Sequence, residues 1–256
     1  MRKLFFTLVV LLSILSMGAT VNLKITTYNI RHGLGVDNVF NFQRVKETIQ
    51  KINPDILILN EVDQGNARSG DVYQAKEIAA LMGMEYYFYA TEGKTNYGIA
   101  VLSKYPVIKA EGFNLPQPRF MKAVQRGCIN MIVNVYGKEL SIYGAHFGLG
   151  GFQEVQKELE EIYKRYQNNP ITSVIGGDFN LEWAPLRSAV PQMFKSDFKS
   201  SNHSIGKDLY TIPADSPGPQ IDFLLVTNDV IVKDTYTYDS WASDHLPVIA
   251  EIELEL

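Results

Sequence analysis

Apolar residues recur along the chain with two spacings, one typical of helices and one typical of strands. From Phe42 to Ile52 an apolar side chain occurs every three or four residues, which predicts a helix that ends at Asn53-Pro54. Two further helices are predicted over about residues 72–82 and 152–166. Short segments rich in β-branched and aromatic residues predict strands at 23–30, 56–59, 86–90, 99–103, 128–136, 139–145, 173–175, 222–226, 230–238 and 247–254.

The order of these elements indicates an α/β protein. Helices and strands alternate at first, and the middle of the chain then carries strands in succession, with a hairpin turn at 134–139 around Gly137. About ten strands with three or four helices favour two packed β-sheets covered by helices over one doubly wound sheet. No repeat, low-complexity tract or linker occurs between residues 22 and 256, so we expect one domain over this range.

The first 19 residues have the pattern of a secretory signal peptide. Arg2 and Lys3 precede an apolar run over residues 4–15, and a cleavage region with small residues follows at 16–19. The run is shorter than the roughly 20 residues that a membrane span needs, which favours cleavage over a retained N-terminal anchor. We therefore expect a periplasmic or extracellular monomer without stable membrane insertion after cleavage.

The composition is that of a globular protein, with 46% hydrophobic and 20% charged residues. Cys128 is the only cysteine, which excludes an intramolecular disulfide and a Cys-x-x-Cys motif. Loss of Arg2 and Lys3 from the 24 Lys+Arg would leave 22 against 28 Asp+Glu, a net charge of −6. This balance argues against sequence-independent coating of DNA or anionic membranes, but a phosphate-cleaving enzyme can rely on a metal ion and a few local arginines.

Polar residues stand where several predicted strands begin or end. Each of them alone is more often a turn former or a helix cap than a ligand. Together they would bring carboxylate, amide and imidazole groups to one rim of the sheets. The residues are Asn29, Glu61, His146, Asp178, Asn180, Asp244 and His245.

Six short motifs contain these residues and Asp222. They are Thr27-Tyr28-Asn29-Ile30, Leu59-Asn60-Glu61-Val62, Gly144-Ala145-His146, Gly176-Gly177-Asp178-Phe179-Asn180, Gln220-Ile221-Asp222-Phe223 and Ser243-Asp244-His245-Leu246-Pro247-Val248. In their order and their spread over almost all of residues 22–256, they resemble the motifs of the endonuclease/exonuclease/phosphatase superfamily, which has the deoxyribonuclease I-like fold. The resemblance implies an α/β four-layer sandwich, in which two packed mixed β-sheets are flanked by helices, and a hydrolase of phosphoester bonds.

Phosphoester hydrolysis and the resemblance together assign a metal site. A divalent cation must neutralise the anionic phosphate oxygens and stabilise the leaving oxygen. Glu61 and Asp244 would supply carboxylate oxygens and Asn29 an amide oxygen. This set of hard oxygen ligands suits Mg²⁺ or Mn²⁺, with Ca²⁺ as an alternative.

The other motif residues would act on the attacking water and on the phosphate. Asp178 and Asn180 would align the water opposite the leaving group. His245 would act on the phosphate or the water, with Asp222 fixing its tautomer from the far ring nitrogen, and His146 would donate a hydrogen bond to a phosphate oxygen. The sequence leaves open whether Asp178 or His245 removes the proton of the water.

Two arginines are candidates for binding the substrate phosphate. Arg31 lies two residues after Asn29, and Arg126 precedes Gly127. An arginine in a loop is about as often solvated or ion-paired, so both interpretations stay open. The loop Gly148-Leu149-Gly150-Gly151 after His146 is, with equal weight, a wall of the substrate pocket or a simple connection.

These observations predict a secreted, divalent-metal-dependent phosphoester hydrolase, with phosphodiesterase or nuclease-like activity as the first candidate. A phospholipid head group or a sugar or inositol phosphate is the alternative to a nucleic acid as substrate. No long basic stripe marks a processive DNA enzyme, and no exposed apolar insertion marks a lipid enzyme. A non-catalytic binding protein on the same scaffold would be expected to lack one or more of the motif residues, and all of them are present.

Overall fold

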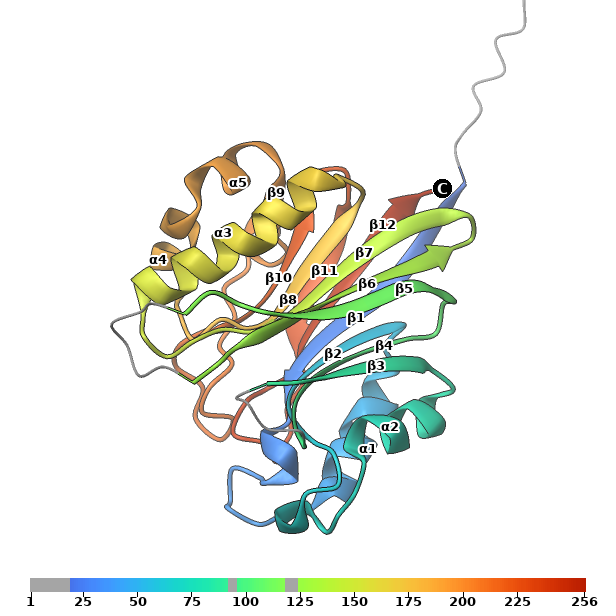
Figure 1. Ribbon diagram of the computed structural model, residues 1–256, viewed down its shortest axis with the longest axis vertical. Helices are drawn as coiled ribbons and strands as arrows, with labels where there is room; N and C mark the ends of the chain where they lie inside the picture. Colours follow the sequence, from blue (N-terminus) through green and yellow to red (C-terminus); the bar gives the residue numbers. More distant parts are fainter. Residues whose placement is uncertain (1–18, 92–95, 118–123) are drawn as a thin grey trace, which may run out of the picture.

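Two β-sheets of six strands each lie face to face (Figure 1). The computed structural model describes residues 19–91, 96–117 and 124–256. Both sheets are mixed, because β1 pairs parallel with β2 and β7 pairs parallel with β8, whereas the other neighbouring strands are antiparallel. The first sheet has the order β11 (Ile231–Thr237), β12 (Val248–Glu255), β1 (Thr20–Asn29), β2 (Ile56–Asp63), β4 (Tyr97–Ser103), β3 (Glu85–Ala90). The second has the order β5 (Val107–Asn114), β6 (Gly127–Val135), β7 (Lys138–His146), β8 (Ser173–Asp178), β10 (Asp222–Thr227), β9 (Phe198–Ser200).

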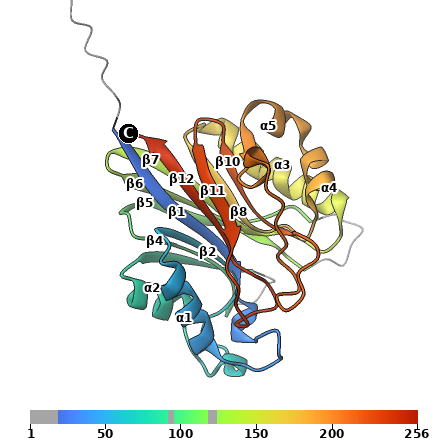
Figure 2. The ribbon, with the colours of Figure 1, turned by 180° about the vertical axis from the view of Figure 1, so that it is seen from behind.

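Helices cover the outer face of each sheet (Figures 1 and 2). α1 (Phe42–Ile52) and α2 (Gln74–Met82) pack on the first sheet. α3 (Phe152–Asn168), α4 (Trp183–Ala189) and α5 (Pro191–Ser196) pack on the second. Short 3₁₀ helices occur at Arg31–Gly33, Ala67–Ser69 and His203–Ile205. The layers are thus helix, sheet, sheet, helix, which confirms the predicted α/β four-layer sandwich.

Three apolar cores separate the four layers, and the alternation of side chains along the central strands supplies them. In β2, Ile56 and Ile58 point into the core between the two sheets, whereas Leu57 and Leu59 point into the core beneath α1 and α2. A third core lies between the second sheet and its helices. Because both faces of the central strands are buried, these strands have continuous apolar sequences.

The ends of the predicted helices follow from local contacts. α1 begins where Asn41 Oδ1 accepts a hydrogen bond from Arg44 N (3.3 Å), and it ends where Asn53 takes a left-handed conformation with φ of 50°. α2 begins at Gln74, two residues later than predicted, because Tyr73 pairs with Gln64 in an isolated β-bridge.

Besides the short 3₁₀ helices, two strands and two α-helices were not predicted, and each has a weak local signal. β5 is an edge strand whose solvent side carries an ion pair between Lys109 and Glu111, which interrupts the apolar pattern. β9 has only three residues. α4 and α5 have only seven and six residues, too few to show a helical spacing of apolar side chains.

The predicted signal peptide lies outside the described residues, except for Ala19. β1 begins directly after it, at Thr20. No helix in the described ranges is long and apolar enough to cross a membrane. The leader, its cleavage and the compartment therefore stay predictions.

The ends of β7 and β8 approach closely because Gly177 has no side chain. Its φ is +149°, where other residues are rare, and an added Cβ would lie 1.7 Å from the carbonyl oxygen of Ala145. The next residue, Asp178, ends β8 and pairs with His146 at the end of β7. The glycine therefore allows β8 to carry Asp178 to this end of the sheet.

The substitution Gly177→Ala should destabilise the protein by about 1–3 kcal/mol or more, because the new methyl group meets backbone that cannot yield without separating two strands. Gly218→Ala is the matched control, since an added Cβ there has no atom within 4 Å. Urea unfolding of both variants measures the difference. Equal unfolding midpoints would show that the strands tolerate the methyl group.

Candidate active site

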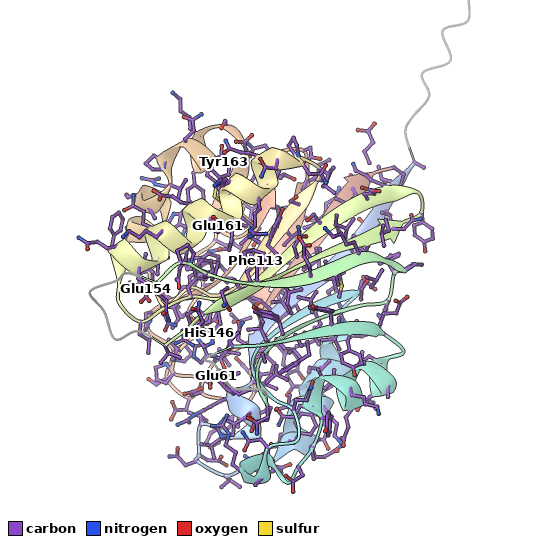
Figure 3. All side chains as sticks on the ribbon, viewed as in Figure 1. Glu61, Phe113, His146, Glu154, Glu161 and Tyr163 are labelled. Atoms are coloured by element: carbon purple, nitrogen blue, oxygen red, sulfur yellow. The ribbon has the colours of Figure 1, made fainter. Side chains whose placement is uncertain are left out.

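Predicted site residues lie at the ends of neighbouring strands from both sheets. Asn29 is the last residue of β1, and His146 and Asp178 are the last residues of β7 and β8. Asp222 begins β10 opposite Asp178 in the antiparallel pair. Figure 3 labels His146, the last residue of β7, and Glu61, which lies in β2 of the other sheet, at this same end of the molecule. The site is therefore assembled where the two sheets meet.

Glu61 reaches the site through an irregularity in β2. Its φ is 57°, a left-handed value that is rare for residues other than glycine, and the pairing of β2 with β4 shifts register between Leu59 and Val62. The bulge turns the Glu61 side chain toward Asn29, whose Nδ2 lies 3.1 Å from Glu61 Oε1. Strained backbone of this kind concentrates at functional sites.

Asp178 lies at the centre of the cluster. Asn29 Nδ2 donates a hydrogen bond to its Oδ2 (3.1 Å), and Asn180 N donates to its Oδ1 (2.9 Å). Two imidazole nitrogens face the same Oδ2 atom, His146 Nε2 at 3.6 Å and His245 Nε2 at 3.8 Å. The Asp178 carboxylate thus contacts the Asn29 amide, the backbone of Asn180 and both histidines.

His245 is backed by a second buried carboxylate. Its Nδ1 lies 2.8 Å from Asp222 Oδ2. Burial lowers the pKa of His245, but the negative charge and hydrogen bond of Asp222, with Asp178 and Asp244 nearby, outweigh this and raise the pKa to about 10. Burial and the Asp222 charge raise the pKa of Asp178 to about 7. His245 is therefore a buried imidazolium that faces Asp178, the carboxylate whose pKa is raised.

His146 has the opposite kind of neighbour. Its Nδ1 lies 3.4 Å from Arg126 Nη1, and both residues are buried. Burial lowers the pKa of His146 well below its usual value, and the positive charges of Arg126 and His245 lower it further. His146 is therefore neutral in an environment that already holds two cations.

A half-buried group lies on the solvent side of the cluster. Arg31 Nε is 3.4 Å from Asp244 Oδ2, and the side chains of both are 29% exposed. Arg31 N donates to Asn29 Oδ1 (3.0 Å). With the contacts above, all ten predicted site residues belong to one connected cluster.

The orientation of Asn29 differs from the one expected of a metal ligand. Its oxygen accepts the hydrogen bond from Arg31 N, and its nitrogen faces Glu61 and Asp178. The amide therefore orients two carboxylates in this structure, whereas the expected role needs its oxygen at the metal.

Two sets of residues could hold a cation. Glu61 and Asp244 are accessible carboxylates, as the expected site requires. Ligand atoms of Asp178, Asp222 and His245 also lie within 4.8 Å of one another. In the second set Asp222 and His245 are already hydrogen-bonded to each other, so a cation there would compete with this pair.

Asn60 is a buried residue of the site for which the sequence predicts no role. Its Nδ2 donates to Ala145 O (2.9 Å), and its Oδ1 accepts from Asp178 N (2.9 Å). It thus connects β2 of the first sheet to β7 and β8 of the second. The available signal was its place beside Glu61 at the end of an apolar strand.

The family model described as "Endonuclease/Exonuclease/phosphatase family" matches residues 26–245, which include all ten predicted site residues. The chain belongs to this family. The resemblance expected from the six motifs is thereby confirmed, and the coarse function of the family is the hydrolysis of phosphoester bonds. Among curated proteins, none matches the sequence.

Several solved structures share the fold at low sequence identity. A Bacteroides vulgatus protein of the endonuclease/exonuclease/phosphatase family is 21% identical, with a TM-score of 0.75 over 92% of this chain and 100% of that one. A Bacteroides thetaiotaomicron mannosyl-6-phosphatase is 19% identical, with a TM-score of 0.71 over 90% and 99%. The human Nocturnin catalytic domain with bound sulfate is 16% identical, with a TM-score of 0.70 over 92% and 97%. At these identities the likeness concerns the fold.

In this family member, two buried glutamates of α3 hold the loop that follows His146. Glu158 Oε2 accepts a hydrogen bond from Gly148 N (2.9 Å), and Glu154 Oε2 accepts one from Gly150 N (2.6 Å). The Oε1 atoms of both are buried and have no hydrogen-bond partner among the described residues. Burial and the neighbouring Glu154 raise the pKa of Glu158 to about 8. The loop is thus fixed by buried carboxyl groups.

Glu158 should make stability fall as pH rises. Its pKa increases from the ordinary 4.5 to about 8 on folding, so between these values the folded state holds a proton that the unfolded state has lost. Each unit of pKa difference corresponds to about 1.4 kcal/mol. The stabilisation is present below pH 4.5 and is lost as pH rises to about 8. Glu158→Gln should make the free energy of unfolding depend less on pH. Urea unfolding at about pH 5, 6.5 and 8 measures this.

The exposed Glu160→Gln on the same helix is the control, and it should keep the wild-type slope. The same slope in Glu158→Gln and wild type would contradict a protonated Glu158.

Proposed function

We propose that this protein is a secreted, divalent-metal-dependent phosphoester hydrolase in which a water attacks phosphorus in line, with a phosphodiester as the first candidate substrate. The observation that carries the proposal is the Asp178 carboxylate, which faces Asn29, His146 and the Asp222-backed His245 at one end of the two sheets. Family membership supports the bond type. The predicted leader at residues 1–19 supports a periplasmic or extracellular location.

Glu61 and Asp244 would hold the metal. Both offer carboxylate oxygens on the accessible side of the cluster, and hard oxygen donors suit Mg²⁺ or Mn²⁺, with Ca²⁺ as an alternative. A bound divalent cation supplies charge neutralisation for the phosphate and the leaving oxygen. Asn29 would join as a ligand only with its amide turned over, since its oxygen accepts from Arg31 N.

The protonation states favour Asp178 as the base. An imidazolium with a pKa of about 10 cannot accept a proton near neutral pH, so His245 would donate a hydrogen bond from Nε2 to a phosphate oxygen. Asp178, with a pKa of about 7, can take the proton of the water. Asn180 would help align that water, because its position is fixed by bonds to Asp178 and to Phe147 O (2.9 Å). Arg31, half-exposed beside Asp244, would contact the phosphate.

Sugar phosphates and phospholipid head groups are the alternative substrates. The mannosyl-6-phosphatase with this fold supports including a sugar phosphate among the candidates. The excess of acidic residues weighs against a long nucleic acid bound through many phosphates. Parallel assays with DNA, RNA, sphingomyelin, inositol phosphates, sugar phosphates and nucleotide diphosphates under Mg²⁺ would assign the substrate class.

Wild-type protein should hydrolyse an aryl phosphodiester with Mg²⁺ or Mn²⁺ and lose this activity in EDTA. His245→Ala should lower kcat by at least about 100-fold, because a hydrogen-bond donor positioned at the phosphate contributes about 10²–10³-fold. His203→Ala is the control, since His203 stacks on Trp183 outside the cluster. Activity in EDTA, or none with any divalent metal, would reject the proposal, and the latter result would favour a non-catalytic binding protein.

Glu61→Gln should shift activation to a metal concentration about tenfold higher or more, since even the partners of metal ligands contribute about 10–100-fold to affinity. Glu85→Gln removes an exposed carboxylate at the start of β3 and serves as the control. Metal titrations of initial rate measure both variants. An unchanged titration in Glu61→Gln would exclude Glu61 as a ligand.

A further inference from the structure

The two histidines of the site face one carboxylate oxygen but have opposite partners behind them. The Nε2 atoms of His146 and His245 lie 3.6 and 3.8 Å from Asp178 Oδ2. Behind His245, the Nδ1 atom meets the carboxylate of Asp222 at 2.8 Å. Behind His146, the Nδ1 atom meets the guanidinium of Arg126 at 3.4 Å. The two rings thus face the same oxygen, but a carboxylate contacts Nδ1 of one and a guanidinium contacts Nδ1 of the other.

The chemistry of arginine decides where the His146 proton lies. A guanidinium has five N–H donors, no acceptor, and does not lose its proton in proteins. A hydrogen bond between Arg126 and His146 Nδ1 therefore requires a lone pair on Nδ1. The single proton of a neutral imidazole is then on Nε2, the nitrogen that faces Asp178.

The position of Arg126 favours action through His146. Arg126 directly precedes β6, whose first residue, Gly127, pairs with His146 at the end of β7. The arginine is only 6% exposed, and its backbone oxygen accepts a hydrogen bond from Leu115 N (2.9 Å). A buried guanidinium held beside one imidazole nitrogen has little freedom to follow a substrate.

We propose that Arg126 is a positioning residue that holds His146 as the neutral Nε2–H tautomer, so that His146 presents one hydrogen-bond donor to the substrate and does not exchange protons with it. The role of His146 toward the substrate rests on the proposed phosphoester hydrolysis, whereas its tautomer does not. The site would then contain one imidazole backed by a carboxylate, His245, and one neutral imidazole backed by a guanidinium, His146.

A neutral donor has a physical advantage at this place. Two imidazolium rings facing the same oxygen would repel each other, and Arg126 would add a third positive charge behind one of them. A neutral Nε2–H still stabilises negative charge that develops on a phosphate oxygen, and it needs no proton transfer to do so. The arginine thereby excludes a base role for His146.

The tautomer can be measured without any substrate. In protein labelled with ¹⁵N in its four histidines, two-bond ¹H–¹⁵N correlations distinguish a protonated from an unprotonated ring nitrogen, and His146→Gln identifies the His146 signals. At neutral pH we expect His146 to carry its proton on Nε2 alone. A His146 ring protonated on Nδ1 would overturn the proposal.

Two substitutions of Arg126 separate positioning from packing. Arg126→Met removes the donor and should give a mixture of the two His146 tautomers, with kcat reduced by about tenfold or more and a smaller change in KM. Arg126→Lys keeps a donor and should restore the Nε2–H signal and part of the lost kcat. A pure Nε2–H signal in Arg126→Met would overturn the proposal, as would a mixture in Arg126→Lys as large as in Arg126→Met.

Two substitutions of His146 keep the test valid if Arg126→Met does not fold. The amide nitrogen of glutamine can take the place of Nε2, and that of asparagine the place of Nδ1. We expect His146→Gln to keep kcat within about tenfold of wild type and His146→Asn to lose about 100-fold, since removal of one positioned hydrogen-bond donor costs about 10²–10³-fold in kcat. Equal, large losses in both variants would exclude a neutral-donor role. The expected tautomer without hydrolysis of any phosphoester would reject the proposed function and retain the positioning role of Arg126.

Discussion

The side chain of Asn60 joins the two sheets where the site is built, and the rest of the arrangement depends on this connection. One end of its amide donates to Ala145 O and the other accepts from Asp178 N, each over 2.9 Å. Asn60 is fully buried, and an unpaired buried donor or acceptor costs about 1–3 kcal/mol, so both bonds resist displacement. They fix the end of β2 against the ends of β7 and β8. Glu61, the next residue, is thereby held at a set place relative to Asp178.

A second connection between the sheets is electrostatic. His245 precedes β12 in the first sheet, and Asp222 begins β10 in the second, so their hydrogen bond also spans the interface. Burying an ion pair costs desolvation that the mutual attraction only partly offsets. Asp222 adds to this cost, because its Oδ1 is buried and has no hydrogen-bond partner among the described residues. A pair of this kind is poorly explained by stability, and its place beside Asp178 connects it to the chemistry.

The sequence predicts those parts of the structure that depend on local patterns. The continuous apolar run of β2 and the spacing in α1 reflect burial directly, so both were located from the sequence. Site residues could be proposed because strand ends and short motifs are also local. The contact of Arg126 with His146 depends on the pairing of β6 with β7, and the role of Asn60 depends on the packing of one sheet on the other. Such contacts have no local signature, and the direction of the Asn29 amide has none either.

Asn29 and Asp178 each use one side-chain atom to bind the backbone and the other to contact the site. Asn29 Oδ1 accepts from Arg31 N and Asp178 Oδ1 accepts from Asn180 N, so each stabilises a residue two positions on. Arg31 and Asn180 have φ of 42° and 49°, a left-handed conformation that costs about 1–2 kcal/mol outside glycine. The other atoms, Asn29 Nδ2 and Asp178 Oδ2, face the cluster. A substitution at either residue therefore disturbs the backbone together with the chemistry, whereas the imidazoles of the site make no such bond to a turn.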